Sequence, residues 1–249
     1  MIVMLTLVKA EGYRMLHRFD FFAVAMVAAI VTVLGSLVVC MTDISFDGWK
    51  ANFMGDILQS GGVLIVIYSG FVSLYMMSDY FKYKLFNSEI VNGNRMCRIY
   101  GVHTVLVAAV ASAVFCFVVI LACIIYTLET GEQACNQMAE KMLLLFCIVF
   151  RMACVAVLHI YLLRNVFIAM LLYIINQVTI VGMFFSVIEG VFDRKVAVFT
   201  SVDQLHIIFD TTTNGQCLTW IIFGTVIEIA IMGILFYLCY LWKGKRVYE

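Results

Sequence analysis

Residues 141–163 read KMLLLFCIVFRMACVAVLHIYLL, an apolar run that is interrupted near its centre by a single arginine, Arg151. A helix needs about 20 predominantly apolar residues to cross the hydrocarbon core of a bilayer, so this run is long enough for one span. An ionised side chain at that depth costs about 2.5 to 3.5 kcal/mol on insertion scales. The run therefore predicts a membrane-spanning helix with a buried charge that needs a partner or water.

Five further stretches of this kind lie on either side of it, at residues 21–41, 57–78, 99–127, 166–189 and 217–242. Hydrophobic residues make up 64% of the chain and charged residues 13%, whereas soluble domains have roughly 45–50% and about 25%. We expect one all-α membrane domain over residues 1–249, with six transmembrane helices and no room for a soluble catalytic module. Proline is absent, so bends in the helices must come from glycine, polar residues or π-bulges.

The orientation follows from the lysine and arginine residues in alternate connections, because cytoplasmic loops are enriched in them. One side has eleven of them and the other four, which places both termini in the cytoplasm of a cell-membrane protein. The eleven are Lys9, Arg14, Arg18, Lys82, Lys84, Arg95, Arg98, Arg164, Lys243, Lys245 and Arg246, and the four are Lys50, Lys141, Arg194 and Lys195.

Three segments outside the spans carry apolar patterns of their own. Residues 1–18 combine apolar and basic positions, which predicts an interfacial helix or, alternatively, a basic leader that only fixes the topology. Residues 79–98 have an apolar stripe at helical spacing, typical of an amphipathic helix that docks into a partner or lies on the membrane. Residues 190–216 are too apolar for a free outer loop, so we expect them to dip back toward the bilayer before the last span.

Polar side chains occur at similar depth in the last three spans. Arg151 lies near the centre of the fourth, Asn176 and Gln177 near the centre of the fifth, and Glu228 near the centre of the sixth. We hypothesise that Arg151 pairs with Glu228 and that Asn176 or Gln177 completes the hydrogen bonds. The cluster either pins the helices together or lines a substrate path, and Tyr68 and Ser69 of the second span are weaker candidates for that path.

Several kinds of chemistry have no signature in the chain. The sequence contains no GxxxxGK[ST] phosphate loop, no HExxH and no GxSxG motif, so we expect neither a catalytic site nor a bound metal or cofactor. The neutral formal charge does not favour a nucleic-acid partner. None of the nine cysteines stands in a CxxC pattern, although Cys135 and Cys217 lie in or beside predicted outer loops and could pair.

The order of these features resembles the permease subunits of type-2 ATP-binding-cassette exporters. The resemblance covers essentially the whole chain and rests on the start LVKAEGYRMLHRFD, the six spans, the segment KLFNSEIVNGNRMCRIYGVHTV between the second and third spans, and the outer insertion. The size and the lack of a fused ATPase look most like permeases of peptide-antibiotic or lantibiotic immunity and export.

That resemblance implies two permease chains, identical or related, that bind two ATPase subunits carrying ATP and Mg²⁺. The ATPases would push on the inner segment between the second and third spans, which would act as a coupling helix. The residues that the resemblance nominates for coupling are Lys84, Phe86, Glu89, Ile90 and Arg95. The alternatives are a small integral membrane enzyme and a channel or scaffold that is not coupled to ATP.

Overall fold

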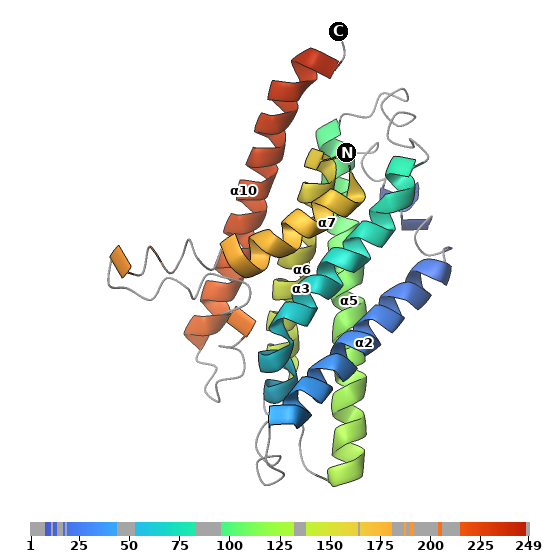
Figure 1. Cartoon of the computed structure of the whole chain (residues 1–249), viewed down its shortest axis with the longest axis vertical. Coiled ribbons are helices and arrows are strands. Elements are labelled where there is room, and N and C mark those ends of the chain that lie inside the picture. Colours follow the sequence, from blue (N-terminus) through green and yellow to red (C-terminus); the bar gives the residue numbers. More distant parts are fainter. Residues whose placement is uncertain are drawn as a thin grey trace.

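The computed structural model describes the helical body of the chain. The described residues are 8–10, 12–13, 17, 19–43, 53–82, 96–131, 138–163, 165–180, 187, 190–191, 204–205 and 215–247. The helices in chain order are α2 (Phe19–Asp43), α3 (Phe53–Lys82), α5 (Met96–Thr130), α6 (Met138–Leu163), α7 (Val166–Ile175), the π-helical turn η2 (Asn176–Ile180) and α10 (Gly215–Val247). Across these ranges the regular structure is entirely helical and contains no strand, as the sequence predicts, and Figure 1 shows the helices gathered into one elongated bundle.

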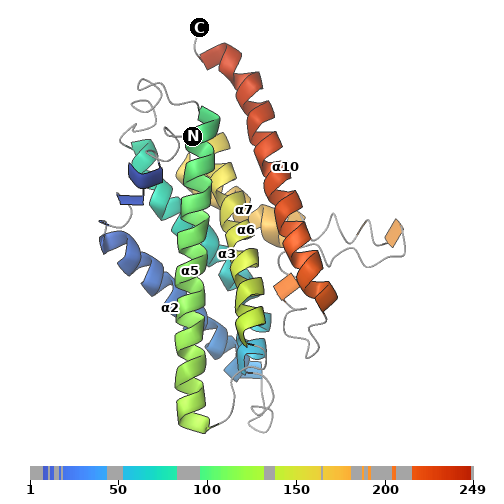
Figure 2. The ribbon, with the colours of Figure 1, turned by 180° about the vertical axis from the view of Figure 1, so that it is seen from behind.

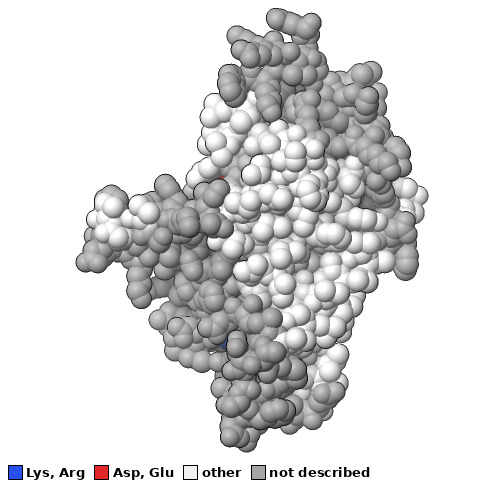
Figure 3. Space-filling model, viewed as in Figure 1, with Lys and Arg blue, Asp and Glu red and all other residues white. Residues whose placement is uncertain are grey.

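Four of the described helices are long and apolar enough to cross a membrane, and they contain the windows Gly61–Ser78, Met96–Leu128, Met138–Leu163 and Ile221–Cys239. Shorter apolar stretches cover Phe22–Val38 and Val166–Val178. The surface agrees with this character, because the described face in Figure 3 is almost free of lysine, arginine, aspartate and glutamate. The chain is therefore a helical protein suited to a membrane interior.

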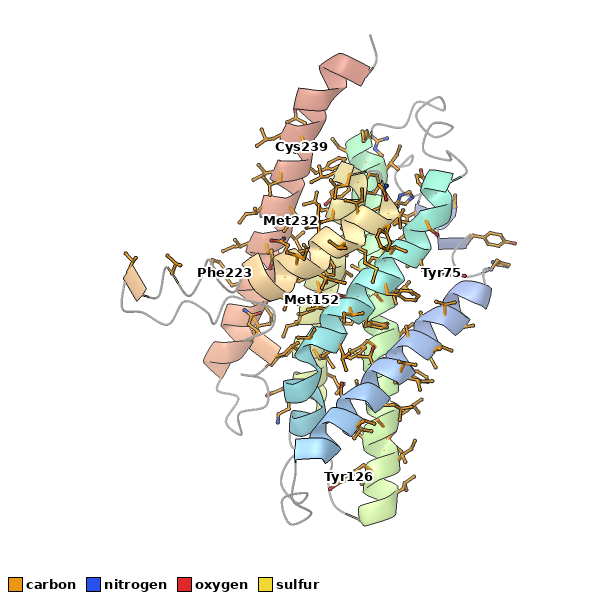
Figure 4. All side chains as sticks on the ribbon, viewed as in Figure 1. Tyr75, Tyr126, Met152, Phe223, Met232 and Cys239 are labelled. Carbon is orange, nitrogen blue, oxygen red and sulfur yellow. The ribbon has the colours of Figure 1, made fainter. Side chains whose placement is uncertain are left out.

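Helix α6 forms the centre of the bundle and contacts α3, α5, α7 and α10. Within its apolar window 72% of the residues are buried, whereas only 17% are buried in the window of α10. Met152, at the middle of the bundle in Figure 4, has no exposed surface. Most of α10 consequently presents apolar side chains outward, and Figure 2 shows it lying along one flank of the other helices.

Small residues allow the helices to approach each other closely. A Cβ atom added to Gly61 of α3 would strike Ser36 Oγ of α2, so these two helices meet backbone to side chain. The same holds for Gly70 of α3, whose added Cβ would lie 2.8 Å from ring atoms of Tyr173 of α7. Close approach through small residues is the usual way to pack helices where lipid removes the hydrophobic driving force.

The boundary between α6 and α7 lies where the sequence analysis placed it, at residues 163 and 166. Asn165 caps α7, because its side-chain oxygen accepts hydrogen bonds from the backbone N–H groups of Phe167 and Ile168 at 3.2 and 3.3 Å. The helix does not continue uniformly after Ile175 but widens into η2, so polar Asn176 and Gln177 begin a π-helical turn. This turn is one of the bending devices expected in a chain without proline.

The ends of the helices define two ends of the bundle. In Figure 1, α3 and α10 finish and α5 begins at the upper end, while α5 finishes and α6 begins at the lower end. At the upper end, residues 8–10 and 12–13 are helical, within the segment expected to form an interfacial helix. Tyr13 stacks there on His17 with ring centroids 3.8 Å apart.

Candidate functional site

The site begins with Arg151, which the central helix α6 places in the interior of the bundle. Its side chain is only 1% exposed, although it is the most strongly basic group a chain can bury. Its Nε lies 2.8 Å from Glu228 Oε2 of α10, and this carboxylate is 27% exposed. The predicted pairing of these two side chains is therefore present, and it joins the best-buried helix to the most exposed one.

A second partner reaches Arg151 from outside the two helices. Arg151 Nη2 donates a hydrogen bond of 2.6 Å to Gln204 Oε1, and both Gln204 and the adjacent Leu205 are completely buried. These two residues form a helical turn within the segment 190–216, which was expected to dip back toward the bilayer. Residues 204–205 are buried inside the protein, where Gln204 contributes an amide to the site, and the predicted path of the rest of the segment lies outside the described residues.

Gly224 of α10 lets these groups come together. A Cβ atom added there would lie 3.5 Å from Arg151 Nη1 and 3.6 Å from Gln204 Nε2. The guanidinium and the amide thus lie against a part of α10 that has no side chain of its own. We call Arg151, Gln204, Gly224 and Glu228 the arginine junction, because it connects α6, α10 and residues 204–205 of the segment 190–216, which is called the outer segment after its predicted position.

The physical effect of the junction is to stabilise a charge that would otherwise be costly. A buried arginine cannot lose its proton, so its charge has to be balanced by an acid and by hydrogen-bond acceptors. Glu228 supplies the opposite charge and Gln204 an uncharged acceptor. Any movement of α10 or of the outer segment away from α6 would leave the guanidinium without one of these partners.

The amide acceptor that the structure describes is Gln204, whereas the sequence analysis nominated Asn176 or Gln177. Both nominated residues lie in η2, which contacts α3 and α7, and Gln177 is buried with 5% exposure. The backbone N–H of Asn176 donates to the carbonyls of Leu172 and Tyr173. The role of Asn176 or Gln177 beside Arg151 stays a prediction, and Gln204 is an acceptor that depth along the fifth helix did not indicate, because it lies in the segment 190–216.

Tyr68 and Ser69 connect helices through hydrogen bonds. Tyr68 Oη donates to the carbonyl of Ala111 in α5 at 2.9 Å, and Ser69 Oγ lies 2.6 Å from Tyr173 Oη in α7. Ser69 is completely buried, whereas the ring of Tyr68 borders an apolar groove of about 480 Å³ between α2 and α3. The contacts of Ser69 explain its burial without a substrate path.

A group of aromatic residues and histidine packs the upper end of the bundle. His103 Nδ1 of α5 lies 2.6 Å from Tyr161 Oη of α6, and the ring of Tyr80 of α3 meets the imidazole edge to face. Tyr100 of α5 stacks on Phe236 of α10, with ring centroids 3.9 Å apart. The sequence analysis did not identify this group. Aromatic residues near those ends of α3, α5, α6 and α10 that meet at the upper end of the bundle could have indicated it.

Other nominated residues give less information. Lys84, Phe86, Glu89, Ile90 and Arg95 lie outside the described residues, as do the side chains of Cys135 and Cys217. Six cysteines among the described side chains are free thiols. Within the described part of the chain, no group of three or more histidine, cysteine, aspartate or glutamate side chains is arranged to hold a metal ion.

No protein-family model, curated protein sequence or solved structure matches this chain significantly. The chain is defined by its own features as a helical membrane-type protein with a buried, charge-paired junction. Its function has to be argued from those features and from the sequence resemblance described above.

Proposed function

We propose that this chain is the membrane-spanning permease subunit of an ATP-driven exporter. In this proposal it has six spans and cytoplasmic termini in the cell membrane, and separate ATPase subunits bind ATP and Mg²⁺. Two permease chains, identical or related, would form the transport unit. The substrate would be hydrophobic or amphipathic, with a peptide antibiotic as the leading class.

The observation that carries the proposal is the way α3 and α5 flank the interval 83–95. Helix α3 ends at Lys82 and α5 begins at Met96, both at the upper end of the bundle. These helices have 30 and 35 residues, which correspond to about 45 and 52 Å at 1.5 Å per residue. A force applied to the interval 83–95 would therefore act on two long helices.

Both long helices, α3 and α5, pack against the central helix of the bundle. Helices α3 and α5 each contact α6, which carries Arg151. Displacement of α6 relative to α10 would strain the pair of Arg151 with Glu228 and the hydrogen bond to Gln204. This gives a contiguous route from the interval 83–95 to the outer segment, through packed helices with a discrete contact at the end.

Energy would have to come from another subunit. The chain has no phosphate-binding loop of the P-loop type, and the predicted membrane helices take up most of its length. The alternative of a membrane enzyme gains nothing from the arginine junction, because Arg151 is enclosed at 1% exposure and offers no open reactive position. The buried charge pair fits a moving helical bundle better than a reaction centre.

The test is purification of the tagged chain from its native host in a mild detergent, followed by ATPase assay and peptide identification. We expect co-purification of a P-loop ATPase and ATP hydrolysis above that of a mock preparation. The combined substitution of Phe86→Asp and Ile90→Asp should abolish both, because it places charges on the apolar stripe of the interval. The matched control is Leu128→Asp, which makes the same change at an 81% exposed position at the opposite end of α5.

Two results would count against the proposal. One is purification of the inserted chain with no ATPase in any detergent or nanodisc preparation. The other is equal ATPase recovery with the Phe86→Asp and Ile90→Asp variant and with the Leu128→Asp control. In either case the interval 83–95 would not be the place where force enters.

A further inference from the structure

A hollow of about 370 Å³ separates α5 from α10 near the upper end of the bundle. It exists because each wall carries a glycine, Gly101 on α5 and Gly233 on α10. A Cβ atom added to either glycine would meet no atom within 4 Å. Cys154 of α6 lines the hollow from the central helix. The space is therefore bounded by three helices rather than left by a loose contact of two.

The walls of the hollow are apolar and partly rigid. Tyr100 and Phe236 stack nearly parallel at 9°, which fixes one side. Ile229 and Met232 of α10 also line the hollow, and Met232 is labelled in Figure 4. None of the described lining residues carries a formal charge. Sites lined by apolar and aromatic groups bind apolar bodies, and the lack of a charge favours an uncharged ligand.

One buried polar group in the lining has no well-formed hydrogen bond to any residue that the structure describes. Thr104 of α5 is 7% exposed, and its Oγ1 has no hydrogen-bond partner of acceptable geometry among the described residues. The phenol of Tyr100, one turn earlier, lies near enough to Thr104 for a weak side-chain hydrogen bond, but the two groups do not reach the distance and angle of a well-formed one. A buried hydroxyl without a partner is unfavourable, because its hydration has been lost without compensation. A ligand with a hydroxyl group would supply the missing partner.

The hollow opens at the apolar outer surface of the bundle. Val105 on α5 and Tyr237 on α10 are among its lining residues and are 57% and 51% exposed. Both helices present apolar side chains to the outside along this flank, so a molecule dissolved in lipid can enter without crossing water. Entry from the membrane agrees with the absence of charge in the lining.

We propose that this hollow binds one neutral, lipid-soluble molecule with a hydroxyl group. The apolar body lies between Gly101 and Gly233, against the stacked rings of Tyr100 and Phe236. The hydroxyl group bonds Thr104 Oγ1. This site does not depend on ATP coupling or on a second permease chain, so it goes beyond the transport function proposed above.

The experiment uses the full chain in liposomes and two photoactivatable probes. One probe is a long-chain alcohol with a diazirine in its chain, and the other is the diazirine alkane of equal length without the hydroxyl. After illumination, mass spectrometry measures the labelling of peptides that contain residues 97–105 and 229–237. Peptides of α2, which has exposed apolar side chains, serve as the comparison. The proposal predicts saturable labelling by the alcohol at the hollow and linear, unsaturable labelling on α2.

Substitutions then locate the site. Gly233→Phe or Gly101→Phe fills the open space and should remove the saturable component, whereas Ile231→Phe, on the exposed side of the same helix, should leave it intact. Thr104→Val, which nearly keeps the side-chain shape, should weaken the alcohol about three- to tenfold, the range that one hydrogen bond contributes, and Thr104→Ser should restore it. The affinity of the alkane should not change with Thr104.

Three outcomes would overturn the proposal. Labelling that rises linearly at the hollow as it does on α2 would mean bulk lipid only. Saturable labelling that survives both glycine substitutions would place the ligand elsewhere. Equal affinity of the alcohol and the alkane would remove the assigned role of Thr104.

Discussion

The arginine junction predicts that Glu228→Gln is far more harmful than an ordinary loss of one carboxylate. The substitution keeps the size of the side chain and an acceptor oxygen but removes the charge that balances Arg151. Since Arg151 is 1% exposed and cannot deprotonate, its charge stays buried after the balancing charge of Glu228 has been removed. Breaking a buried pair in this way costs about 3 kcal/mol.

The assay is thermal unfolding of the purified chain in nanodiscs, followed by tryptophan fluorescence. For a chain of this size, 1 kcal/mol corresponds to about 2–4 °C, so Glu228→Gln should lower Tm by about 6–12 °C. The matched control is Glu140→Gln, at an exposed position in the first turn of α6. That change affects only the interaction with the helix dipole and should cost less than about 1 kcal/mol.

The decisive variant is the double substitution Arg151→Met with Glu228→Gln. Removing the arginine also removes the unbalanced charge, so the double variant should recover at least about 1 kcal/mol relative to Glu228→Gln alone. Complete recovery is not expected, because Gln204 Oε1 loses its donor. If the double variant is no more stable than Glu228→Gln, the reasoning about charge balance is refuted.

Further predictions use the same assay. Gly70→Ala should cost about 1–3 kcal/mol, because the new Cβ atom would lie 2.8 Å from ring atoms of Tyr173. Gly101→Ala meets open space and should be neutral or stabilising. Equal effects of the two substitutions on Tm would contradict this packing. Gln204→Ala should cost about 1–3 kcal/mol by leaving an Arg151 N–H without its acceptor, and a wild-type Tm would show that the outer segment does not contribute to the junction. Tyr161→Phe should cost about 1 kcal/mol, because it removes the 2.6 Å contact with His103. Tyr237→Phe, at a 51% exposed position, should leave Tm unchanged. A lower Tm for Tyr237→Phe alone would be inconsistent with the packing of the upper aromatic group.

The helical nature of the chain and several helix ends could be read from the sequence, because apolar runs encode them locally. The boundary at 163 and 166 is the clearest case, since Arg164 and Asn165 interrupt the apolar run and Asn165 is a favourable cap. The pairing of Arg151 with Glu228 could also be predicted, because matched depth and opposite charge restrict the partners available within lipid.

The remaining parts of the site depend on tertiary structure. Gln204 lies outside the predicted spans, so its distance from Arg151 could not be derived from depth in a span. The π-helical turn at Asn176 was not located by the sequence analysis, because apolar periodicity does not distinguish one π-helical turn from the α-helix that precedes it. The hollow beside Thr104 required the facing positions of glycines from two helices far apart in sequence.

The central claim is that a membrane-embedded helical bundle is driven from the cytoplasm through the interval 83–95. The most direct test is a pair of reporters inserted in turn after Lys84 in the otherwise intact chain, green fluorescent protein and alkaline phosphatase. The account predicts a fluorescent protein and an inactive phosphatase at this position. An active phosphatase with no fluorescence would place the interval outside the cell and contradict the account.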